Sequence, residues 1–495
     1  MRNWFIFTLC MLGQMAFAQV QFEDRSEGLP EHIYSGGWEH FVGGGVAVFD
    51  CDGDALPDLY AAGGTQPARL MHNNGNFEFE VVASPRLTGV SGAYPLDIDA
   101  DGFMDLFVLR VGANVVLRGK GDCRFENATQ AMGFVAEDRW STAFTAWWKE
   151  GGDRPQMAVG NYVDRLDPNG PFEACDDNTL LTPAAQGYVS SPLSPGYCTL
   201  SLLAARDAWG LHRLRFSNDR HYYVSGGKEQ MWDIAEKRFL TTEDGWPDLS
   251  VWGMGIASRD ITGDGRDEIV LTSMGDQLLQ LAKSDGYRAA PFDIGTYAHR
   301  PHMGGDGRPS TGWHAEFGDV NNDGLPDLFI AKGNVDQMPG MAMRDPNNLL
   351  MQQAGGTFVE AAAQAGVASL ARSRGAALAD FDNDGKLDLL VMNRRAPMEL
   401  YRNKTPDAGN WVRIKLKQLG GNRDAVGARV DLFVGENIQS MQKLVGGGHA
   451  GGQALPLHFG LGQGVAAQVV VRWPDGSIGA YRVQAGETAT LEKGS

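Results

Sequence analysis

The sequence predicts an all-β protein, in which a seven-bladed β-propeller is followed by a small C-terminal β-sandwich-like domain. Three observations lead to this prediction. An acidic nine-residue pattern occurs five times, short apolar runs of strand length flank its copies, and no long amphipathic helix is evident. A chain of 495 residues is too long for one ordinary domain and long enough to bury a large core.

Residues 1–18 are predicted to be a signal peptide. Arg2 precedes an apolar run from Trp4 to Leu12, and Ala16-Phe17-Ala18 has the small-residue pattern of a cleavage site. The run is far shorter than the ~20 residues that cross a bilayer, and no later segment reaches that length. We therefore expect a chain that is exported, to the periplasm or the extracellular space, and that is not membrane-spanning.

The charge balance argues against a nucleic-acid partner. Asp and Glu number 61 against 43 Lys and Arg, for a net charge of −18. A protein that binds a duplex needs a basic surface to neutralise phosphates. Either the surface is strongly solvated, or many of these carboxylates bind a divalent cation.

The acidic pattern places oxygen-bearing side chains at positions one, three, five and nine. Its five copies, numbered here as loops one to five, are Asp50, Asp52, Asp54, Asp58; Asp97, Asp99, Asp101, Asp105; Asp260, Thr262, Asp264, Glu268; Asp319, Asn321, Asp323, Asp327; and Asp380, Asp382, Asp384, Asp388. Position six is glycine in four copies and Ala55 in the first.

These residue types at this spacing predict calcium sites, up to five in number. Calcium takes six to eight oxygen ligands, and alternate positions of a tight loop can point their oxygens inward. Glycine at position six allows the positive-φ turn between them. Magnesium demands stricter octahedral geometry, and an EF-hand closes at position twelve between helices. Acidic surface turns without a cation are the alternative interpretation.

The spacing of the copies predicts the architecture. First ligands at 50, 97, 260, 319 and 380 are separated by 47, 163, 59 and 61 residues, so the long gap has room for two more units. One degenerate unit is visible at 146–162, and a weaker one at 213–227. Seven units of short strands predict the propeller, over residues 19–405. An open solenoid is the alternative.

Four cysteines remain after the signal peptide. An even number in an exported protein favours disulfides, and four cysteines allow three connectivities. Cys175 and Cys198 share one polar loop-like stretch, which leaves Cys51 and Cys123 as the second pair. No Cys-x-x-Cys spacing supports zinc.

The tail, residues 410–495, has a pattern of its own. Trp411 to Lys417 alternates apolar and basic residues, as a strand with one solvated face does. Further strands are expected at 429–434 and 469–473, and together they predict a small β-sandwich. His449 and His458 are interpreted as structural residues, although they could be ligands.

The loops resemble FG-GAP or VCBS repeats, the calcium-binding blades of integrin α propellers. The tail resembles the ASPIC and UnbV domain through residues 422–429, 458–462 and 471–476, and with residues 43–50 it is similar to the cartilage acidic protein family and its bacterial relatives. Ala55, Thr262 and Glu268 depart from the loop pattern, which implies weaker binding in loops one and three.

These features favour a calcium-stabilised, non-catalytic module that binds a protein or glycan partner outside the cytoplasm. An enzyme that uses the propeller channel is the alternative, with His299, Arg300, His302 and His314 as candidates, although no known catalytic motif is present. Trp147 and Trp148 could stack on a sugar or belong to the core. A structural surface component, attached through its tail, is the third hypothesis.

Overall fold

The computed structural model describes residues 19–135, 137–167, 173–219, 226–298 and 305–494. The predicted signal peptide, with His299, Arg300 and His302, lies outside these ranges. Over the described residues the chain is nearly all β, with one short helix, α1 (Ala362–Ala365), and four single-turn 3-10 helices: η1 (Ser26–Gly28), η2 (Trp38–His40), η3 (Thr242–Asp244) and η4 (Phe292–Ile294). The predicted all-β class is confirmed.

Within these residues the strands pair as seven successive four-stranded antiparallel units. Units one and two contain β2 (Val46–Phe49), β3 (Asp58–Ala61), β4 (Arg69–Asn73), β5 (Phe79–Val82), and β6 (Val90–Leu96), β7 (Asp105–Ala113), β8 (Val115–Gly119), β9 (Phe125–Asn127). Units three and four contain β10 (Asp138–Trp147), β11 (Gln156–Asn161), β12 (Asn178–Pro183), β13 (Tyr188–Leu193), and β14 (Thr199–Arg206), β15 (His212–Asn218), β16 (Gln230–Asp233), β17 (Arg238–Phe239).

The last three units follow the same order. Units five and six contain β18 (Gly253–Arg259), β19 (Glu268–Gly275), β20 (Leu278–Lys283), β21 (Gly286–Ala289), and β22 (Ser310–Gly318), β23 (Asp327–Lys332), β24 (Asn348–Gln352), β25 (Phe358–Glu360). Unit seven contains β26 (Ser373–Ala379), β27 (Asp388–Asn393), β28 (Glu399–Asn403) and, from the other end of the chain, β1 (Phe22–Asp24).

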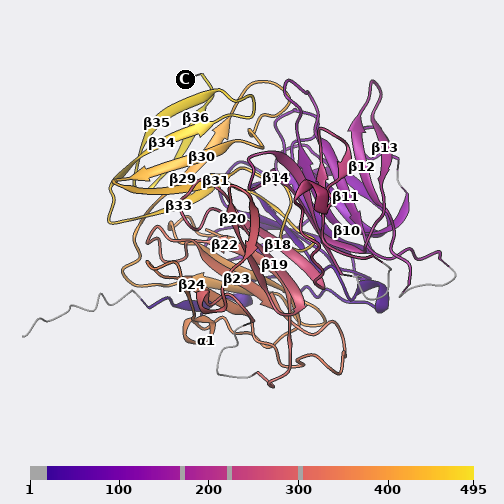
Figure 1. Ribbon diagram of the computed structural model, residues 1–495, viewed down its shortest axis with the longest axis horizontal. Coiled ribbons are helices and arrows are strands. Elements are labelled where there is room, and N and C mark those ends of the chain that lie inside the picture. Colours follow the sequence, from indigo (N-terminus) through magenta and orange to yellow (C-terminus); the bar gives the residue numbers. More distant parts are fainter. Residues whose placement is uncertain (1–18, 136, 168–172, 220–225, 299–304, 495) are drawn as a thin grey trace, which may run out of the picture.

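The units close into a ring whose first strands face the centre. Each first strand contacts the first strand of the next unit, and β26 contacts β2. Figure 1 shows the C-terminal tail, in yellow, at one end of the molecule beside the propeller strands. The pairing of β1 with β28 also ties the two ends of the propeller together. Burial follows this order: β2, β6 and β26 are buried throughout, whereas β5 and β9 are partly exposed. Inner strands are therefore continuous apolar runs, because neighbours cover both of their faces.

The tail forms two sheets around a core of its own. The first sheet contains β33 (Leu457–Gly462), β29 (Asn410–Lys417) and β36 (Glu487–Glu492), and the second contains β31 (Asn437–Gln442), β30 (Arg429–Val434), β34 (Ala466–Arg472) and β35 (Ile478–Gln484). Val412, Leu432, Phe459 and Trp473 meet in the core between them. A further short strand, β32 (Gln453–Ala454), leaves the tail and pairs with β2 of the propeller.

Two disulfides join neighbouring units. Cys51 pairs with Cys123, and Cys175 pairs with Cys198, so the predicted connectivity is confirmed. The first links loop one to the turn between β8 and β9, and the second links unit three to the start of β14. Among the described residues, no helix is both long and apolar enough to cross a membrane.

Candidate functional site: the acidic loops and the tail that covers them

The five acidic loops occupy equivalent places in the fold. Each connects the first strand of a unit to the second, in units one, two, five, six and seven. Since the first strands line the centre, all five loops lie at the same end of the propeller. Units three and four have residues 148–155 and 207–211 in this place. The degenerate copy predicted at 146–162 is therefore the β10–β11 hairpin, which has lost most of the acids of the pattern.

The loops share one pattern of internal hydrogen bonds. The carboxylate at position one accepts the backbone N–H of position six, at 3.1, 3.0, 2.8, 2.7 and 2.8 Å in loops one to five. The carboxylate at position five accepts the N–H of position seven, at 2.8–3.0 Å. Position six has positive φ in every loop, as predicted: Ala55 (72°), Gly102 (93°), Gly265 (85°), Gly324 (92°) and Gly385 (87°).

The carboxylate at position nine holds each loop against its sheet. In loop two, one oxygen of Asp105 accepts the N–H of Ile98 at 2.9 Å, and the other accepts the N–H of Gly119 at 2.9 Å. The same two hydrogen bonds recur in the other four loops. In each, the carboxylate at position nine accepts one backbone N–H from loop position two and one from the third strand of the unit. Each carboxylate oxygen has two lone pairs, so these bonds leave acceptor capacity for a cation.

Three loops bring ligand oxygens close together. Carboxylate oxygens lie within 4.8 Å of one another in the sets Asp50, Asp52, Asp58; Asp97, Asp99, Asp101; and Asp380, Asp382, Asp388. In loop two, Oδ1 of Asp97 and Oδ1 of Asp99 are buried and have no hydrogen-bond partner. Asp97 is only 4% exposed. Buried oxygens without a donor are expensive, and a hard cation would satisfy them.

Burial strongly disfavours the ionised form of these carboxyls. It raises the pKa of Asp58 and Asp105 to about 7 and that of Asp97 to about 6, against the opposing effect of backbone hydrogen bonds. In loop four, burial and the neighbouring Asp323 raise the pKa of Asp319 to about 8. These values hold for loops without a cation, because a bound cation would favour the charged carboxylates.

Basic side chains already approach four of the loops. His72 lies 2.9 Å from Asp52, Arg118 lies 2.7 Å from Asp99, Arg429 lies 3.4 Å from Asp260, and Arg402 lies 2.6 Å from Asp382. Loop four differs. Among the described residues, none forms an ion pair with Asp319, Asp323 or Asp327, although the first and last of these are almost fully buried. Loop four thus lacks a direct ion pair from the described residues, although the charge of the buried Arg259 acts on Asp319.

The tail rests directly on loops two to five. Arg423 approaches Asp97 at 4.0 Å, and Arg429 joins Asp260 to Asp267, with 2.8 Å to the second. His458 Nε2 lies 2.8 Å from Asn322 Oδ1. Arg413 contacts Asp380 at 3.2 Å. These tail residues were not found as site residues in the sequence. The alternating basic strand Trp411 to Lys417 was the available signal, since a basic strand suits an acidic loop surface.

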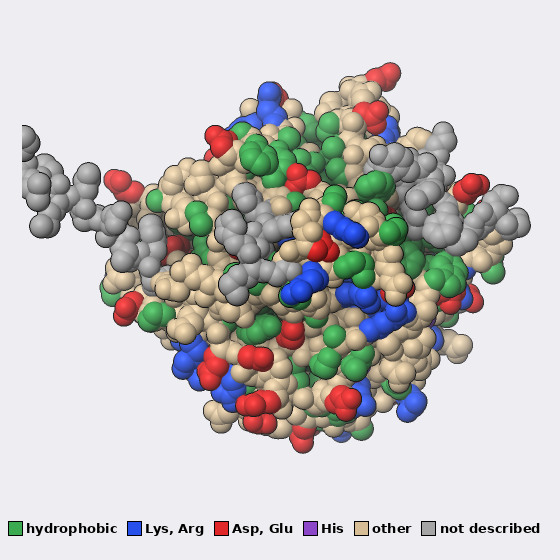
Figure 2. All heavy atoms as spheres, turned by 90° about the horizontal axis from the view of Figure 1, so that it is seen from below, with side chains coloured by type: hydrophobic (Ala, Val, Ile, Leu, Met, Phe, Trp, Pro, Cys, Tyr) green, Lys and Arg blue, Asp and Glu red, His purple; other side chains and the backbone are tan. Residues whose placement is uncertain are grey.

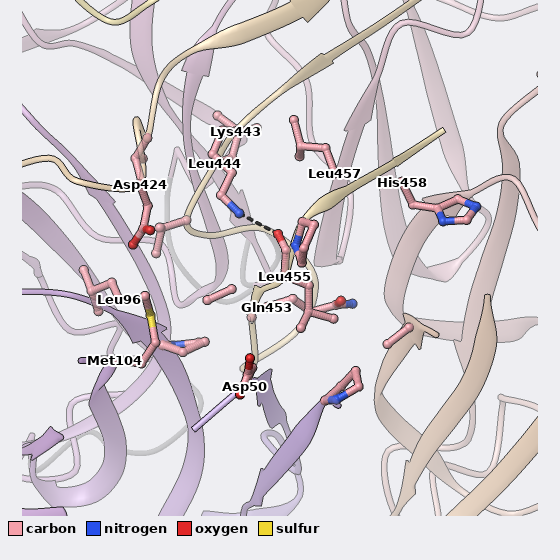
Figure 3. Close-up of a pocket in the computed structure, with 18 of the residues that line it drawn as sticks. Asp50, Leu96, Met104, Asp424, Lys443, Leu444, Gln453, Leu455, Leu457 and His458 are labelled. Carbon is pink, nitrogen blue, oxygen red and sulfur yellow. Dashed lines mark hydrogen bonds between the residues drawn. The ribbon is translucent and has the colours of Figure 1, made fainter. Parts of the chain in front are cut away.

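A cavity of about 670 Å³ lies between the tail and the loops. Figure 3 shows Asp50 from the propeller and Asp424 and Lys443 from the tail around it, with Lys443 Nζ donating to the carbonyl of Leu455 at 2.6 Å. Trp148 also lines this cavity, whereas Trp147 is buried in the core between units three and four. The two tryptophans considered for sugar stacking therefore have different surroundings.

Residues 445–452 of the tail, the channel plug, fill the centre of the ring. Val445, Gly446, Gly448 and Gly451 form bridges with the first strands of units three, four, five and two. The approach is very close, because a Cβ on Gly92 of β6 would lie 1.5 Å from the carbonyl oxygen of Ala450. From the opposite end, the backbone N–H of Gly43 donates to His449 Nε2 at 3.2 Å.

The channel plug also contacts His314. The N–H of His449 donates to His314 Nδ1 at 3.2 Å, and His314 Nε2 lies 3.3 Å from Glu316. Both ring nitrogens thus have protein partners. Of the four candidate catalytic residues, His314 lies within the described ranges, and His299, Arg300 and His302 lie outside them.

Comparisons with known proteins match separate parts of the chain to two families. The ASPIC and UnbV family matches residues 418–495, and the FG-GAP-like repeat family matches residues 50–108, 260–330 and 319–391. Cartilage acidic protein 1 of Xenopus tropicalis is 33% identical over 120 residues, and that of Homo sapiens is 32% identical over 120. Each alignment covers 23% of this chain and 18% of the relative, so the chain matches less than a fifth of these relatives' length.

The solved structures that resemble this chain have lower sequence identity to it. A crystal structure of BBS1N in complex with ARL6DN has a TM-score of 0.45 at 11% identity, over 76% of this chain and 94% of that one. The BP39L lectin from Burkholderia pseudomallei has a TM-score of 0.37 at 10% identity, over 89% and 96% of the two chains. Such scores assign no ligand. From the family matches, the chain carries FG-GAP-like repeats and a C-terminal ASPIC and UnbV domain, as its resemblance to the cartilage acidic protein family implied.

Proposed function

We propose that this protein is an exported, calcium-binding β-propeller that serves as a non-catalytic binding module for a protein or glycan partner. The loops would hold calcium with their carboxylate and amide side chains, and the ions would stabilise the end of the propeller on which the tail rests. Calcium supplies positive charge and six to eight coordination positions, and the aspartates supply oxygens at the matching spacing.

The unbalanced charge of the buried loop carboxylates carries this proposal. Asp319 and Asp327 in loop four are 3% and 0% exposed and have no ion pair from the described residues. In loop two, two buried carboxylate oxygens have no donor. Several carboxylates held this close at neutral pH favour either protonation or a cation, and an oxygen-rich cage suits calcium.

The export part of the proposal is supported by the two disulfides. Disulfides form and persist in oxidising compartments and are rare in the cytosol. Cys51 lies inside loop one, so that bridge and the proposed ion would hold the same segment.

The non-catalytic part is supported by the filled centre of the ring. Enzymes built on propellers use polar groups around an open channel, whereas here the channel plug and residues 41–44 meet at His449. His314, the described member of the catalytic hypothesis, is 5% exposed and bound on both nitrogens. A binding surface is therefore expected on the outside of the molecule.

Thermal unfolding of the mature protein tests the proposal. Melting curves would be recorded with chelator, with calcium, and with magnesium after chelator. A site that binds only the native state adds about 2.7 kcal/mol when the ligand is at 100 times its Kd. Several such sites should raise the Tm by roughly 5 °C or more in this chain. Equal melting in calcium and chelator would disprove the calcium assignment.

Single-loop variants show which loops contribute. Asp97→Asn and Asp319→Asn keep the side-chain shape but remove one charge each, and each should lower the calcium-bound stoichiometry measured by calorimetry. Asp122→Asn is the matched control, because this aspartate is exposed and lies outside the loops.

A further inference from the structure

Four arginines gather around one aspartate at the end of the propeller opposite the acidic loops. Arg372 and Arg374 lie at the start of β26, and Arg394 and Arg395 follow the end of β27. The other ends of these two strands border loop five, so the arginines lie on the face away from the tail. We call Arg372, Arg374, Arg394 and Arg395 the arginine cluster.

Among the described residues, Asp336 is the one carboxylate that forms ion pairs with the arginine cluster. Oδ1 of Asp336 lies 2.6 Å from Arg394, 3.0 Å from Arg395 and 3.9 Å from Arg372. Arg374 instead donates to the carbonyls of Phe41, Ser373, Asn334 and Val335, and its guanidinium lies 4.0 Å from the ring centre of Trp313. Three of the four arginines thus share one carboxylate, in a chain whose net charge is −18.

Two members of the arginine cluster are fixed and two reach solvent. Arg374 and Arg394 are 0% and 1% exposed and are held by backbone carbonyls. Arg372 and Arg395 are partly exposed, at 26% and 41% of their side chains. Asp336 and the carbonyl of Gly36 hold Arg395 in position, so this part of the surface is preorganised before a ligand binds.

An exposed aromatic ring belongs to the segment that the arginine cluster contacts. Arg394 and Arg395 both donate to the carbonyl of Gly36, two residues before Trp38. The side chain of Trp38 is 49% exposed. Its ring packs edge-to-face against the ring of Trp140, with 5.2 Å between the ring centres. Figure 2 shows Lys and Arg side chains near the middle of the face seen from below.

We propose that Arg372, Arg395 and Trp38 bind an acidic polysaccharide, one that carries carboxylate or sulfate groups. This inference rests on the proposed function as a binding module and names the class of its partner. A guanidinium presents a planar fork that matches carboxylate and sulfate oxygens. The exposed indole offers an apolar face to the C–H groups of a sugar ring. An acidic peptide would use the arginines but would gain little from Trp38.

Binding to defined polymers tests the assignment. Affinity electrophoresis of the full-length mature protein in calcium would use polygalacturonate, heparin, uncharged dextran and polyglutamate as probes. We expect retardation by polygalacturonate or heparin, weakened by added salt, and none by dextran. The double variant Arg372→Gln/Arg395→Gln should bind at least about tenfold more weakly. Arg238→Gln/Arg288→Gln is the control, since it removes the same charge from exposed positions elsewhere.

The outcomes separate this inference from the proposed function. Unchanged affinity of the cluster variant, or no binding of either acidic polysaccharide, would overturn the inference even if calcium still raises the Tm. Trp38→Ala should weaken polysaccharide binding and leave polyglutamate binding nearly unchanged. Stronger binding of polyglutamate than of both polysaccharides would show that the partner is an acidic peptide. Each variant should melt within about 2 °C of the native protein, which excludes misfolding as the cause.

Discussion

The backbone N–H of His449 donates a hydrogen bond to Nδ1 of His314, at 3.2 Å, in the middle of the propeller. His449 belongs to the tail and His314 to the first strand of unit six, so the bond joins the two parts of the chain at the ring centre. Burial lowers the pKa of His449 to about 3, which keeps its ring neutral at physiological pH. The tail is thus a part of the propeller interior as well as a neighbour of its loops.

Replacement of this histidine should destabilise the whole molecule. His449→Ala removes the ring that accepts the N–H of Gly43 and packs against Trp313, and it leaves a cavity. We expect a loss of roughly 3 kcal/mol in the free energy of unfolding, measured by urea titration. Leu419→Ala, also in the tail but 98% exposed, should change it by less than about 0.5 kcal/mol. Equal effects would mean that the channel plug contributes nothing.

Removal of the tail should destabilise the propeller itself. A chain that ends at Pro406 exposes the inner faces of the first strands and leaves Asp260 and Asp267 without Arg429. We expect a much lower Tm and rapid proteolysis, both reversed by co-expression of residues 407–495. A truncated propeller that melts near the full-length value would instead support a tail that serves only for attachment.

The backbone of loop one is strained at Ala55, and substitution by glycine should relieve this strain. Ala55 has φ 72°, whereas glycine occupies this position in the other four loops. Ala55→Gly should stabilise the calcium-free protein by about 0.5–1 kcal/mol, measured by urea titration. Gly53→Ala, in the same loop at φ 90° with open space around it, should cost about 1 kcal/mol. If both variants changed the free energy of unfolding in the same direction, the positive φ of Ala55 would not be the cause.

Arg429 is expected to stabilise the tail contact at loop three. It approaches Asp260, Asp267 and Asp431, and its removal leaves these carboxylates without their main counter-charge. Arg429→Gln should cost about 3 kcal/mol in urea titrations. Arg472→Gln is the matched control, because Arg472 also contacts Asp431 but is 57% exposed and should matter little.

A buried glutamate in unit four predicts a pH dependence. Burial raises the pKa of Glu229 to about 8, although the N–H of Asn218 and Arg215 oppose the shift. An unfolded glutamate titrates near 4.5, so the native state binds the extra proton between these values. The contribution of Glu229 to stability therefore falls as the pH rises from about 4.5 to about 8.

Comparison with a neutral variant isolates this effect. Glu229→Gln should be more stable than the native protein at pH 8.5, by a few kcal/mol at most, and should lose that advantage at pH 5. Thermal melts in chelator at both pH values measure the difference. An advantage of equal size at both pH values would show that ionisation of Glu229 is not responsible.

Local pattern was sufficient to predict much of the fold. The five acidic loops recur with the same polar spacing, and each hydrogen bond within them joins residues a few positions apart, as between Asp97 and Gly102. The flanking apolar runs form the inner strands because continuous burial requires continuous apolar sequence. The disulfide pairs were predictable because few connectivities were possible.

The repeat, its loop geometry and the all-β class could be predicted from the amino-acid pattern, since each depends on neighbours along the chain. Three sets of contacts could not: Arg413, Arg423 and Arg429 face the acidic loops, residues 445–452 fill the ring, and Arg372 and Arg395 meet at Asp336. These contacts join residues tens to hundreds of positions apart. Closure of the ring and the attraction between opposite charges bring these residues together, and the spacing of residues along the chain does not predict either effect.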